Sequence, residues 1–551
     1  MAQQAKAAAL LHWPVRSIDQ RAWLLAALSG VLQAIIFPSI DWHYLCWFAF
    51  APALVAILRA RPKQDIAVPE SLSSNLAPAT PWQGFLLGWL TGLIWSFGTC
   101  FWIYHVLNTY GGLDAPIAGA LLVVFCLILA LHHAAWGLLV AWTARRRAVF
   151  ALIAAPFLWV AVETFRTYIT SFPWDLLGTV QVDNIPLARL GTVTGVYGLS
   201  FEIMLVNTVF AAAFIVPRRR RRSIFLAAAF ATILVQATEL IEPPALPAPD
   251  TARLVQLNIP ILNSDQWTAQ YFQRELTRLR EKSIPRPEQT MGAPPPEIVV
   301  WPESPAPFFI SDREFRTAVS DIARASNAYV IVGSLGEVGV SSQSTRQLYN
   351  SAALITPSGD WTARYDKIHL VPFGEYVPFH SLLSFADKLT KEVGDFVPGA
   401  NRTPFDVGRY KAGVFICYES VFPGEIREFA RNGANVFINI SNDGWFGRYG
   451  APKQHLNQAR MRAVENNRWL LRATNTGITS AIDPYGRVVD QAPRETYTYL
   501  DAPFSVMNGT TFYTRHGDWF AFACVIISVL MIIAVAVPSR GASGSVSRET
   551  T

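Results

Sequence analysis

Three polar residues in the second half of the chain follow short predicted strands, and together they could carry out acyl transfer. Cys417 lies in VFICYESVFP, Glu303 in IVVWPESP and Lys367 in WTARYDKIHL. A carboxylate can take the proton of a thiol, and a lysine can stabilise both the thiolate and an oxyanion. A free cysteine with a pKa of about 8.5 is scarcely ionised at neutral pH and needs such neighbours. These residues therefore predict a catalytic set of nucleophile (Cys417), general base (Glu303) and oxyanion-stabilising lysine (Lys367).

Each of these residues also has an ordinary structural explanation when taken alone. A free cysteine is most often a buried apolar residue, and a glutamate or lysine after a strand is usually a solvated loop residue. Glu375, in the loop LVPFGEYVP, could pair with Lys367 without transferring protons. His369 could form a Cys-His pair, but Glu303 already supplies a base and nothing in the sequence orients this imidazole.

The composition indicates a protein that is partly embedded in a membrane and partly globular. Of its 551 residues, 51% are hydrophobic and 16% are charged, which is too apolar for an ordinary soluble protein. The net charge of +6 comes from basic residues beside apolar runs, a pattern typical of topology signals rather than of nucleic-acid binding. The other four cysteines lie within apolar runs: Cys46, Cys100, Cys126 and Cys524. We therefore expect no disulfide within the polar part and no metal site or cofactor.

Eight apolar runs predict about eight transmembrane helices, since roughly 20 helical residues cross the hydrocarbon core. The runs lie at residues 22–38, 42–58, 83–107, 116–143, 149–170, 188–216, 223–240 and 518–537. The first two are short and closely spaced, so a helical hairpin or a partly re-entrant pair is the alternative there. The opening residues lack a convincing cleavage site, so we expect the first run to remain as an anchor.

Basic residues after every second apolar run predict the orientation of the chain. Clusters at 59–63, 145–147 and 218–222 follow the second, fourth and sixth runs, and the positive-inside rule places these connections in the cytoplasm. The long segment after the seventh run is then exported. The alternative, that the clusters are merely solvated loops, does not explain their regular recurrence.

Changes in composition predict where the parts of the chain begin and end. We expect a membrane domain (1–240) with a cytoplasmic linker (60–82), a proline-rich stalk (241–250), a periplasmic catalytic domain (251–515), a C-terminal transmembrane helix (516–538) and a cytoplasmic tail (539–551). Between 251 and 515 short β-like runs alternate with polar helical stretches, which favours an α/β or α+β domain. The strand candidates lie at 252–258, 298–301, 329–333, 351–356, 413–417, 435–440 and 478–482, and the helix candidates at 267–282, 312–325, 425–432 and 454–470.

The segments around the three polar residues resemble those of a known superfamily. WPE, YDKIHLVPFGE and CYE are similar to strand-end segments of the nitrilase superfamily, whose members share a Glu-Lys-Cys triad on an αββα sandwich. LVPFGEYVP, CYESVFP, NISNDGWFG and the membrane segment SFPWDLLG look like the apolipoprotein N-acyltransferase branch. An exported domain between seven leading spans and one trailing span also matches that branch, so the resemblance covers nearly the whole chain.

The resemblance implies a reaction, a location and partners. Cys417 would take a fatty acyl chain from a phospholipid as a thioester and pass it to the α-amino group of a diacylglyceryl-cysteine apolipoprotein. Such a protein works in the bacterial inner membrane with its catalytic domain on the periplasmic side, and we expect a monomer. Because exposing an acyl chain to water costs roughly 0.8 kcal/mol for each CH₂, the nucleophile should lie near the lipid.

The resemblance also implies roles for five further residues. Glu375 and Glu419 match carboxylates that hold the lysine and tune the site, although both are equally explained as structural ion-pair partners. The backbone N–H of Tyr418 matches an oxyanion donor. Trp267 and Trp445 match aromatic residues that position substrate or loops, with core packing as the alternative.

Two other classes of function fit parts of the sequence. A membrane-tethered amidase would use the same three residues to hydrolyse a small amide. A non-enzymatic transporter or scaffold would use the acidic residues of the membrane part: Glu163, Asp175 and Glu202. Four charged residues on the last helix candidate are expected to form a solvated face or ion pairs rather than a phosphate site: Arg460, Arg462, Glu465 and Arg468.

Overall fold

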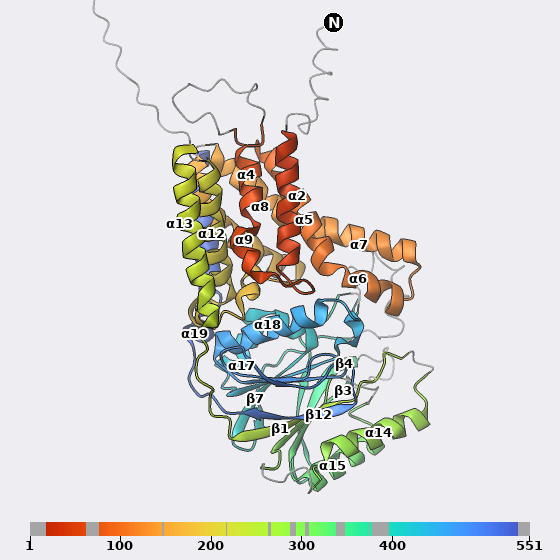
Figure 1. Ribbon diagram of the computed structural model, residues 1–551. Helices are drawn as coiled ribbons and strands as arrows, with labels where there is room; N and C mark the ends of the chain where they lie inside the picture. Colours follow the sequence, from red (N-terminus) through yellow and green to blue (C-terminus); the bar gives the residue numbers. More distant parts are fainter. Residues whose placement is uncertain are drawn as a thin grey trace, which may run out of the picture.

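The chain folds into a bundle of apolar helices and an α/β domain that lies at one end of the bundle (Figure 1). The computed structural model describes residues 18–61, 77–145, 148–215, 218–262, 266–286, 294–303, 308–337, 348–372, 374–376 and 396–537. Most of the predicted linker at 60–82 and the predicted tail at 539–551 lie outside these residues. The predicted stalk contains neither helix nor strand between 241 and 249, and the first strand begins at Asp250.

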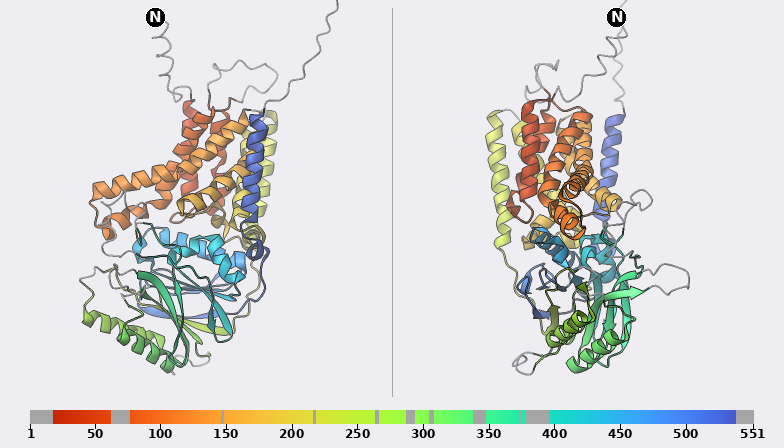
Figure 2. Two further views of the ribbon diagram at one scale, coloured as in Figure 1. Left: turned by 180° about the vertical axis from the view of Figure 1, so that it is seen from behind. Right: turned by 90° about the vertical axis from the view of Figure 1, so that its right-hand side faces the viewer.

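The bundle contains both long and short helices. The main ones are α2 (Gln20–Ile35), α4 (Ala51–Leu58), α5 (Pro81–Cys100), α7 (Ala115–Leu129), α8 (Leu131–Ala144), α9 (Ala148–Thr170), α12 (Val196–Ile215), α13 (Arg218–Ala237) and α20 (Trp519–Ala536). Short helices connect them: η2 (His43–Leu45), α3 (Cys46–Ala49), α6 (Trp102–His105), η4 (Val106–Tyr110), η5 (Leu177–Gln181), α10 (Ile185–Ala188), α11 (Gly191–Thr194) and η6 (Thr238–Leu240). Helix α7 projects sideways from the bundle in Figures 1 and 2.

In the described part of the chain, five helices are long and apolar enough to cross a membrane, or six if one bent pair is a single span. They are Ala115–Ala144, Ala148–Thr170, Val196–Ile215, Arg220–Leu240 and Trp519–Ala536, and the bent pair is Pro81–Cys100 with Trp102–Tyr110. These account for six of the eight predicted runs. The first two runs form helices shorter than 18 residues, and the run predicted at 188–216 starts its long helix only at Val196 because Gly195 (φ 67°) ends α11.

Glycines allow α5 and α8 to pack closely. A Cβ atom added to Gly88 would lie 2.3 Å from the carbonyl oxygen of His133, and one added to Gly137 would lie 2.3 Å from that of Gly84. Small residues at helix contacts permit such backbone approach where lipid provides no hydrophobic driving force. His133 is buried beside this contact.

The α/β domain is built from two six-stranded sheets packed face to face. The strands are β1 (Asp250–Gln256), β2 (Ile298–Val300), β3 (Tyr329–Glu337), β4 (Leu348–Ile355), β5 (Trp361–Asp366), β6 (Phe405–Val407), β7 (Tyr410–Ile416), β8 (Val436–Ser441), β9 (Leu470–Thr474), β10 (Ser480–Ile482), β11 (Val488–Gln491) and β12 (Thr498–Phe504). Their orders are β12-β1-β2-β3-β4-β5 and β11-β10-β9-β8-β7-β6. Strands β1 to β3 and β7 to β9 run parallel, with antiparallel neighbours outside them. Buried residues of both sheets share one apolar cluster, including Leu254, Val300, Val414 and Ile438.

Helices cover the outer face of each sheet and complete the predicted αββα sandwich. Helices α14 (Ala269–Ser283) and α15 (Arg313–Ser326) pack on the first sheet, and their apolar stripes share a second cluster with Val299 and Val330. Helices α17 (Pro423–Arg431) and α18 (Ala451–Asn466) pack on the second sheet, and the short α19 (Phe512–His516) precedes α20. The predicted helix at 454–470 was too long, since Asn467 (φ 52°) ends α18 and Leu470 already belongs to β9.

Helix α18 lies between the second sheet and the bundle (Figure 2). Its Arg460, Arg462 and Glu465 side chains are buried, whereas Lys453 is exposed. Arg460 pairs with Asp183 at 2.6 Å, and Arg462 with Glu465 at 2.9 Å. Of the two predicted arrangements, a solvated face or ion pairs, the structure shows ion pairs for these residues. Arg468 instead donates to backbone carbonyls, including that of Ala434 at 2.7 Å.

Candidate active site

Three strand ends bring the predicted catalytic residues to one place. Glu303 is the third residue after β2, Lys367 directly follows β5, and Cys417 directly follows β7. Two of these strands belong to the first sheet and one to the second, so the site lies where the facing sheets meet. All three side chains are buried, with exposed fractions of 7%, 1% and 6%.

Lys367 is the centre of a buried group of opposite charges. Its Nζ lies 3.2 Å from Glu303 Oε1 and 2.9 Å from Glu375 Oε1. Burial by itself lowers the pKa of this ammonium group, but the two carboxylates and the neighbouring Cys417 raise it well above the ordinary value. Lys367 is therefore a fixed cation. Glu375 is one of its ion-pair partners, which was one of the two explanations predicted for this carboxylate.

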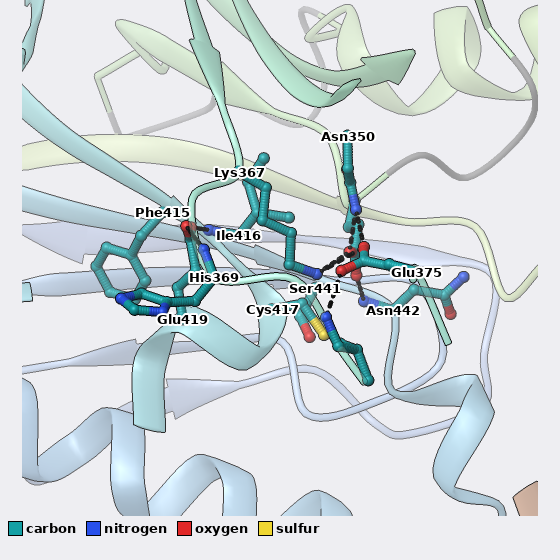
Figure 3. A network of polar contacts seen from close by, with 12 residues as sticks. Asn350, Lys367, His369, Glu375, Phe415, Ile416, Cys417, Glu419, Ser441 and Asn442 are labelled. Atoms are coloured by element: carbon teal, nitrogen blue, oxygen red, sulfur yellow. Dashed lines mark hydrogen bonds and ion pairs between the residues drawn. The ribbon is translucent and has the colours of Figure 1, made fainter. Parts of the chain in front are cut away.

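Cys417 occupies a sharp bend. Its backbone has φ 50°, a left-handed conformation that costs energy in a residue with a side chain, and it opens the short helix η10 (Cys417–Val421) before α17. Figure 3 shows its sulfur on the side of the bend that faces Lys367 and Glu375. Strained residues of this kind cluster at functional sites, because the surrounding structure must hold them there.

The surroundings of Cys417 raise the pKa of its thiol. Burial, followed by the negative charge of Glu303, raises its pKa above the ordinary value, whereas Lys367 and a hydrogen bond with Ser441 lower it. The sequence led us to expect a lowered thiol pKa beside Lys367. The lysine does act in that direction, but desolvation outweighs it.

This raised pKa predicts the pH dependence of thiol modification. A thiolate reacts with iodoacetamide and a thiol does not, so the rate of Cys417 alkylation should keep rising with pH beyond about 8.5, the pKa of an ordinary cysteine. Mass spectrometry of the full-length protein at a series of pH values measures this rate. A rate that levels off below about pH 8 contradicts the raised pKa.

Glu419 ties together the two chain segments that carry Lys367 and Cys417. One oxygen accepts hydrogen bonds from the Tyr365 hydroxyl and from the N–H of Ile368, both at 2.7 Å, and the other accepts from the N–H of Ile416 at 2.6 Å. Burial raises the pKa of this carboxyl to about 7 even though these hydrogen bonds favour the charged form. Glu419 thus contacts the backbone beside the lysine and is not its ion-pair partner.

Two asparagines that sequence reasoning missed complete the surroundings of Glu303. Asn350 donates to Glu303 Oε1 at 2.8 Å and to Glu375 Oε1 at 2.7 Å, and the backbone N–H of Asn442 donates to Glu303 Oε2 at 2.8 Å. Within the described residues, the hydrogen-bond partners of this carboxylate are all donors, which suits a group that accepts a proton. A polar Asn within the apolar strand segment LYNSAALI was the signal that could have revealed Asn350.

Sequence reasoning also missed His455, which contacts the backbone of the bend at Cys417. Its Nε2 lies 3.0 Å from the carbonyl oxygen of Cys417, which can only accept, so Nε2 carries a hydrogen. Its Nδ1 lies 3.0 Å from both Asp443 Oδ1 and Arg472 Nη2. Burial and then the charge of Arg472 lower the pKa of this imidazole, whereas Asp443 raises it. A buried ion pair between Arg472 and Asp443 holds the arrangement.

The remaining predicted residues occupy different places. Tyr418 donates its hydroxyl to the carbonyl oxygen of Ser171 at 2.7 Å. Trp445 packs edge-on against Tyr110 of the membrane part, with ring centroids 5.3 Å apart. Trp267 lies just before α14 and packs against Tyr271 within that helix. In the described chain it makes no contact with Glu303, Lys367 or Cys417.

His369 does not pair with Cys417 in the described structure. Its ring stacks on Phe422 with centroids 4.1 Å apart, and its Nε2 lies 3.1 Å from Glu425 Oε2. Its imidazole is thus oriented, but toward α17. Over the described residues no group of His, Cys, Asp and Glu has the geometry to hold a metal ion.

Comparison with known proteins divides the chain in the same way as the fold. The Carbon-nitrogen hydrolase family matches residues 251–507, and the Apolipoprotein N-acyltransferase N-terminal domain matches residues 29–209. Among solved structures, an amidase of the nitrilase superfamily from Nesterenkonia covers 51% of this chain and 95% of its own, at 17% identity and a TM-score of 0.34.

Curated relatives match over almost the full length. The apolipoprotein N-acyltransferase of Geobacter metallireducens is 37% identical over 522 residues, covering 92% of this chain and 94% of the relative. That of Pseudomonas syringae pv. tomato is 33% identical over 472 residues, covering 82% and 88%. The chain belongs to the apolipoprotein N-acyltransferase family, and its α/β domain has the carbon-nitrogen hydrolase fold.

Proposed function

We propose that this protein transfers a fatty acyl chain from a phospholipid to the α-amino group of the N-terminal S-diacylglyceryl-cysteine of apolipoproteins, through a thioester on Cys417. The observation that carries the proposal is the buried thiol beside a lysine held between two carboxylates. Nucleophile, base and cation are the parts that acyl transfer needs. Family membership supports lipoprotein N-acylation as the overall reaction.

In the first half-reaction Glu303 takes the Cys417 proton as the sulfur attacks the ester carbonyl of the phospholipid. The resulting oxyanion lies beside Lys367, with the backbone N–H of Tyr418 as a second donor. When the tetrahedral intermediate collapses, the C–O bond breaks and protonated Glu303 returns its proton to the leaving oxygen. A lysophospholipid departs and the acyl chain remains on sulfur.

In the second half-reaction the free amine of the apolipoprotein attacks the thioester carbonyl. Glu303 takes a proton from the attacking nitrogen, a C–N bond forms and the C–S bond breaks. The proton returns to sulfur and restores the Cys417 thiol. The two substrates therefore use the same nucleophile in turn, which is a ping-pong sequence.

We further propose that residues 1–240 and 516–538 lie in the bacterial inner membrane with about eight spans, and that residues 251–515 lie on the periplasmic side. The supporting observations are the arginine pattern and large apolar side chains that the bundle exposes, including Ile169 at 76% and Phe230 at 64%. A monomer suffices, since one chain supplies every group in the proposed reaction. Trp267 and Trp445 are proposed to position substrate or the loops around it.

The acyl acceptor distinguishes this function from amide hydrolysis. With phospholipid present, the full-length protein should attach one acyl chain to a synthetic diacylglyceryl-cysteine peptide, as seen by mass spectrometry. The same peptide with an acetylated amine is the matched control and should remain unchanged, because it has no nucleophilic nitrogen. An unmodified amine peptide together with lipid-independent hydrolysis of small amides would support the amidase instead.

A further inference from the structure

A small polar cavity lies inside the helical bundle, where the end of α9 leads into η5. Its walls include Trp95, His133, Glu163, Arg166 and Asp175. The guanidinium of Arg166 stacks over the Trp95 ring, 5.4 Å from its centroid. The free space admits about one water-sized molecule.

Four of these side chains carry polar atoms without a hydrogen-bond partner in the described structure. The atoms are His133 Nδ1, Glu163 Oε2, Arg166 Nε and Nη1, and Asp175 Oδ2. The four residues are only 1%, 1%, 4% and 3% exposed. Leaving charged groups buried and unpaired is costly, above all in an apolar bundle. A water molecule that accepts from Arg166 and donates to the carboxylates satisfies several of them at once.

The segment that follows α9 leads from this cavity to the nucleophile. Residues 171–175 begin and end with left-handed backbone, at Ser171 (φ 49°) and Asp175 (φ 54°). The Ser171 carbonyl holds the Tyr418 hydroxyl, and the Trp174 indole stacks on Tyr418 and on His455, with centroids 6.4 and 5.7 Å apart. One end of the segment thus lies in the cavity, and the rest lies against the two residues that flank or support Cys417.

A further hydrogen bond fixes Trp174 to the interface between bundle and α/β domain. Its Nε1 donates to Gln454 Oε1 at 2.8 Å, and Gln454 Nε2 donates to the carbonyl oxygens of Pro38 at 2.6 Å and Thr99 at 3.2 Å. These contacts leave Trp174 fully buried. A shift of segment 171–175 would therefore be passed on to Tyr418 and His455.

We propose that Arg166 and Asp175, bridged by water bound in this cavity, are positioning residues for Cys417. They hold segment 171–175 against Tyr418 and His455, and through these two residues they fix the strained bend that carries the thiol. Neither residue touches the reacting atoms. The proposal rests on the proposed function, in which Cys417 is the nucleophile.

The positioning role is tested with Asp175→Asn, which keeps the side-chain shape, and with Arg166→Lys, which keeps the charge. In the full-length protein the single-turnover rate of acyl-adduct formation on Cys417 should fall about tenfold or more, as small misplacements of a nucleophile cause. The phospholipid concentration for half-maximal rate should not change. Glu202→Gln, a carboxylate change in the bundle outside the cavity wall, is the matched control. Wild-type rates in the folded Asp175→Asn protein overturn the proposal.

Alkylation of Cys417 separates this proposal from the proposed function. Misplacement moves the thiol away from the Lys367 ammonium, so iodoacetamide should react more slowly with both variants than with wild type. If wild type forms no acyl adduct, the proposed function is contradicted. The alkylation rates then test on their own whether Arg166 and Asp175 position Cys417. Equal alkylation rates in wild type and Asp175→Asn count against it.

The bound water is tested by hydroxyl-radical footprinting of the wild-type protein, with radicals generated from water by X-rays. Trp95 lines the cavity and should be oxidised in spite of its burial. Trp136 is also buried in the same bundle, at 0% exposed against 4% for Trp95, but does not line the cavity, and it should remain unmodified. Equally low oxidation of both tryptophans overturns the occupancy by water.

Discussion

Replacing Lys367 with methionine is expected to abolish acyl transfer and to destabilise the α/β domain. The substitution leaves Glu303 and Glu375 buried and facing each other without their shared cation. Removing one partner of a buried ion pair costs about 3–5 kcal/mol of folding free energy, and losing an oxyanion-stabilising group costs about 10³-fold in rate. Both effects arise from one charge, so they should appear together.

Acyl transfer to the diacylglyceryl-cysteine peptide and thermal unfolding of the purified protein measure the two effects. Lys411→Met is the matched control, because Lys411 lies on β7, the strand that leads to Cys417, and is 58% exposed in a surface pair with Asp406. The control should behave like wild type in both assays. Activity within about tenfold of wild type in Lys367→Met would refute the role given to the lysine.

Replacing Glu303 with glutamine is expected to slow formation of the acyl-enzyme by about 10³-fold, the usual contribution of a general base. Both carboxylate oxygens accept hydrogen bonds, from Asn350 and Lys367 on one side and from the Asn442 N–H on the other. A glutamine amide must turn its NH₂ group toward one of these donors. The variant therefore loses the base and also part of the packing that orients it.

Single-turnover mass spectrometry with phospholipid alone isolates this step from the second half-reaction. Glu314→Gln makes the same chemical change at an exposed position on α15 and should leave the rate unchanged. If Glu303→Gln forms the adduct at the wild-type rate, another group takes the thiol proton. His369 is not a ready substitute, since its imidazole is engaged with Glu425.

The sequence predicted the layered α/β domain and brought Glu303, Lys367 and Cys417 together because each follows a predicted strand, and strand ends are readable from local pattern. The αββα arrangement and the roles of Glu375 and Glu419 came from family resemblance instead. The structure confirms the sandwich and the ion pair of Glu375. It gives Glu419 a different set of contacts, all of them backbone N–H groups or the Tyr365 hydroxyl.

What the sequence could not provide depends on contacts between distant segments. Asn350 and Asn442 bond Glu303 from 47 and 139 positions away in the chain, and His455 contacts the Cys417 carbonyl from 38 positions away. No local period encodes such pairs. The sequence did not decide whether Arg460, Arg462 and Glu465 of α18 are solvated or form buried ion pairs, because the bundle that buries them lies elsewhere in the sequence. The net effect on the Cys417 thiol pKa was likewise inaccessible, since desolvation depends on the surrounding packing.

The most direct test of the account is the mass of the intact protein after incubation with a phospholipid of defined acyl chains and no acceptor. We predict a mass increase of one acyl group, mapped to the peptide that contains Cys417, removable by hydroxylamine and absent in Cys417→Ser. Addition of the diacylglyceryl-cysteine peptide should discharge it. Peptide acylation by wild type without any adduct on Cys417, or full activity of Cys417→Ser, would contradict the thioester mechanism.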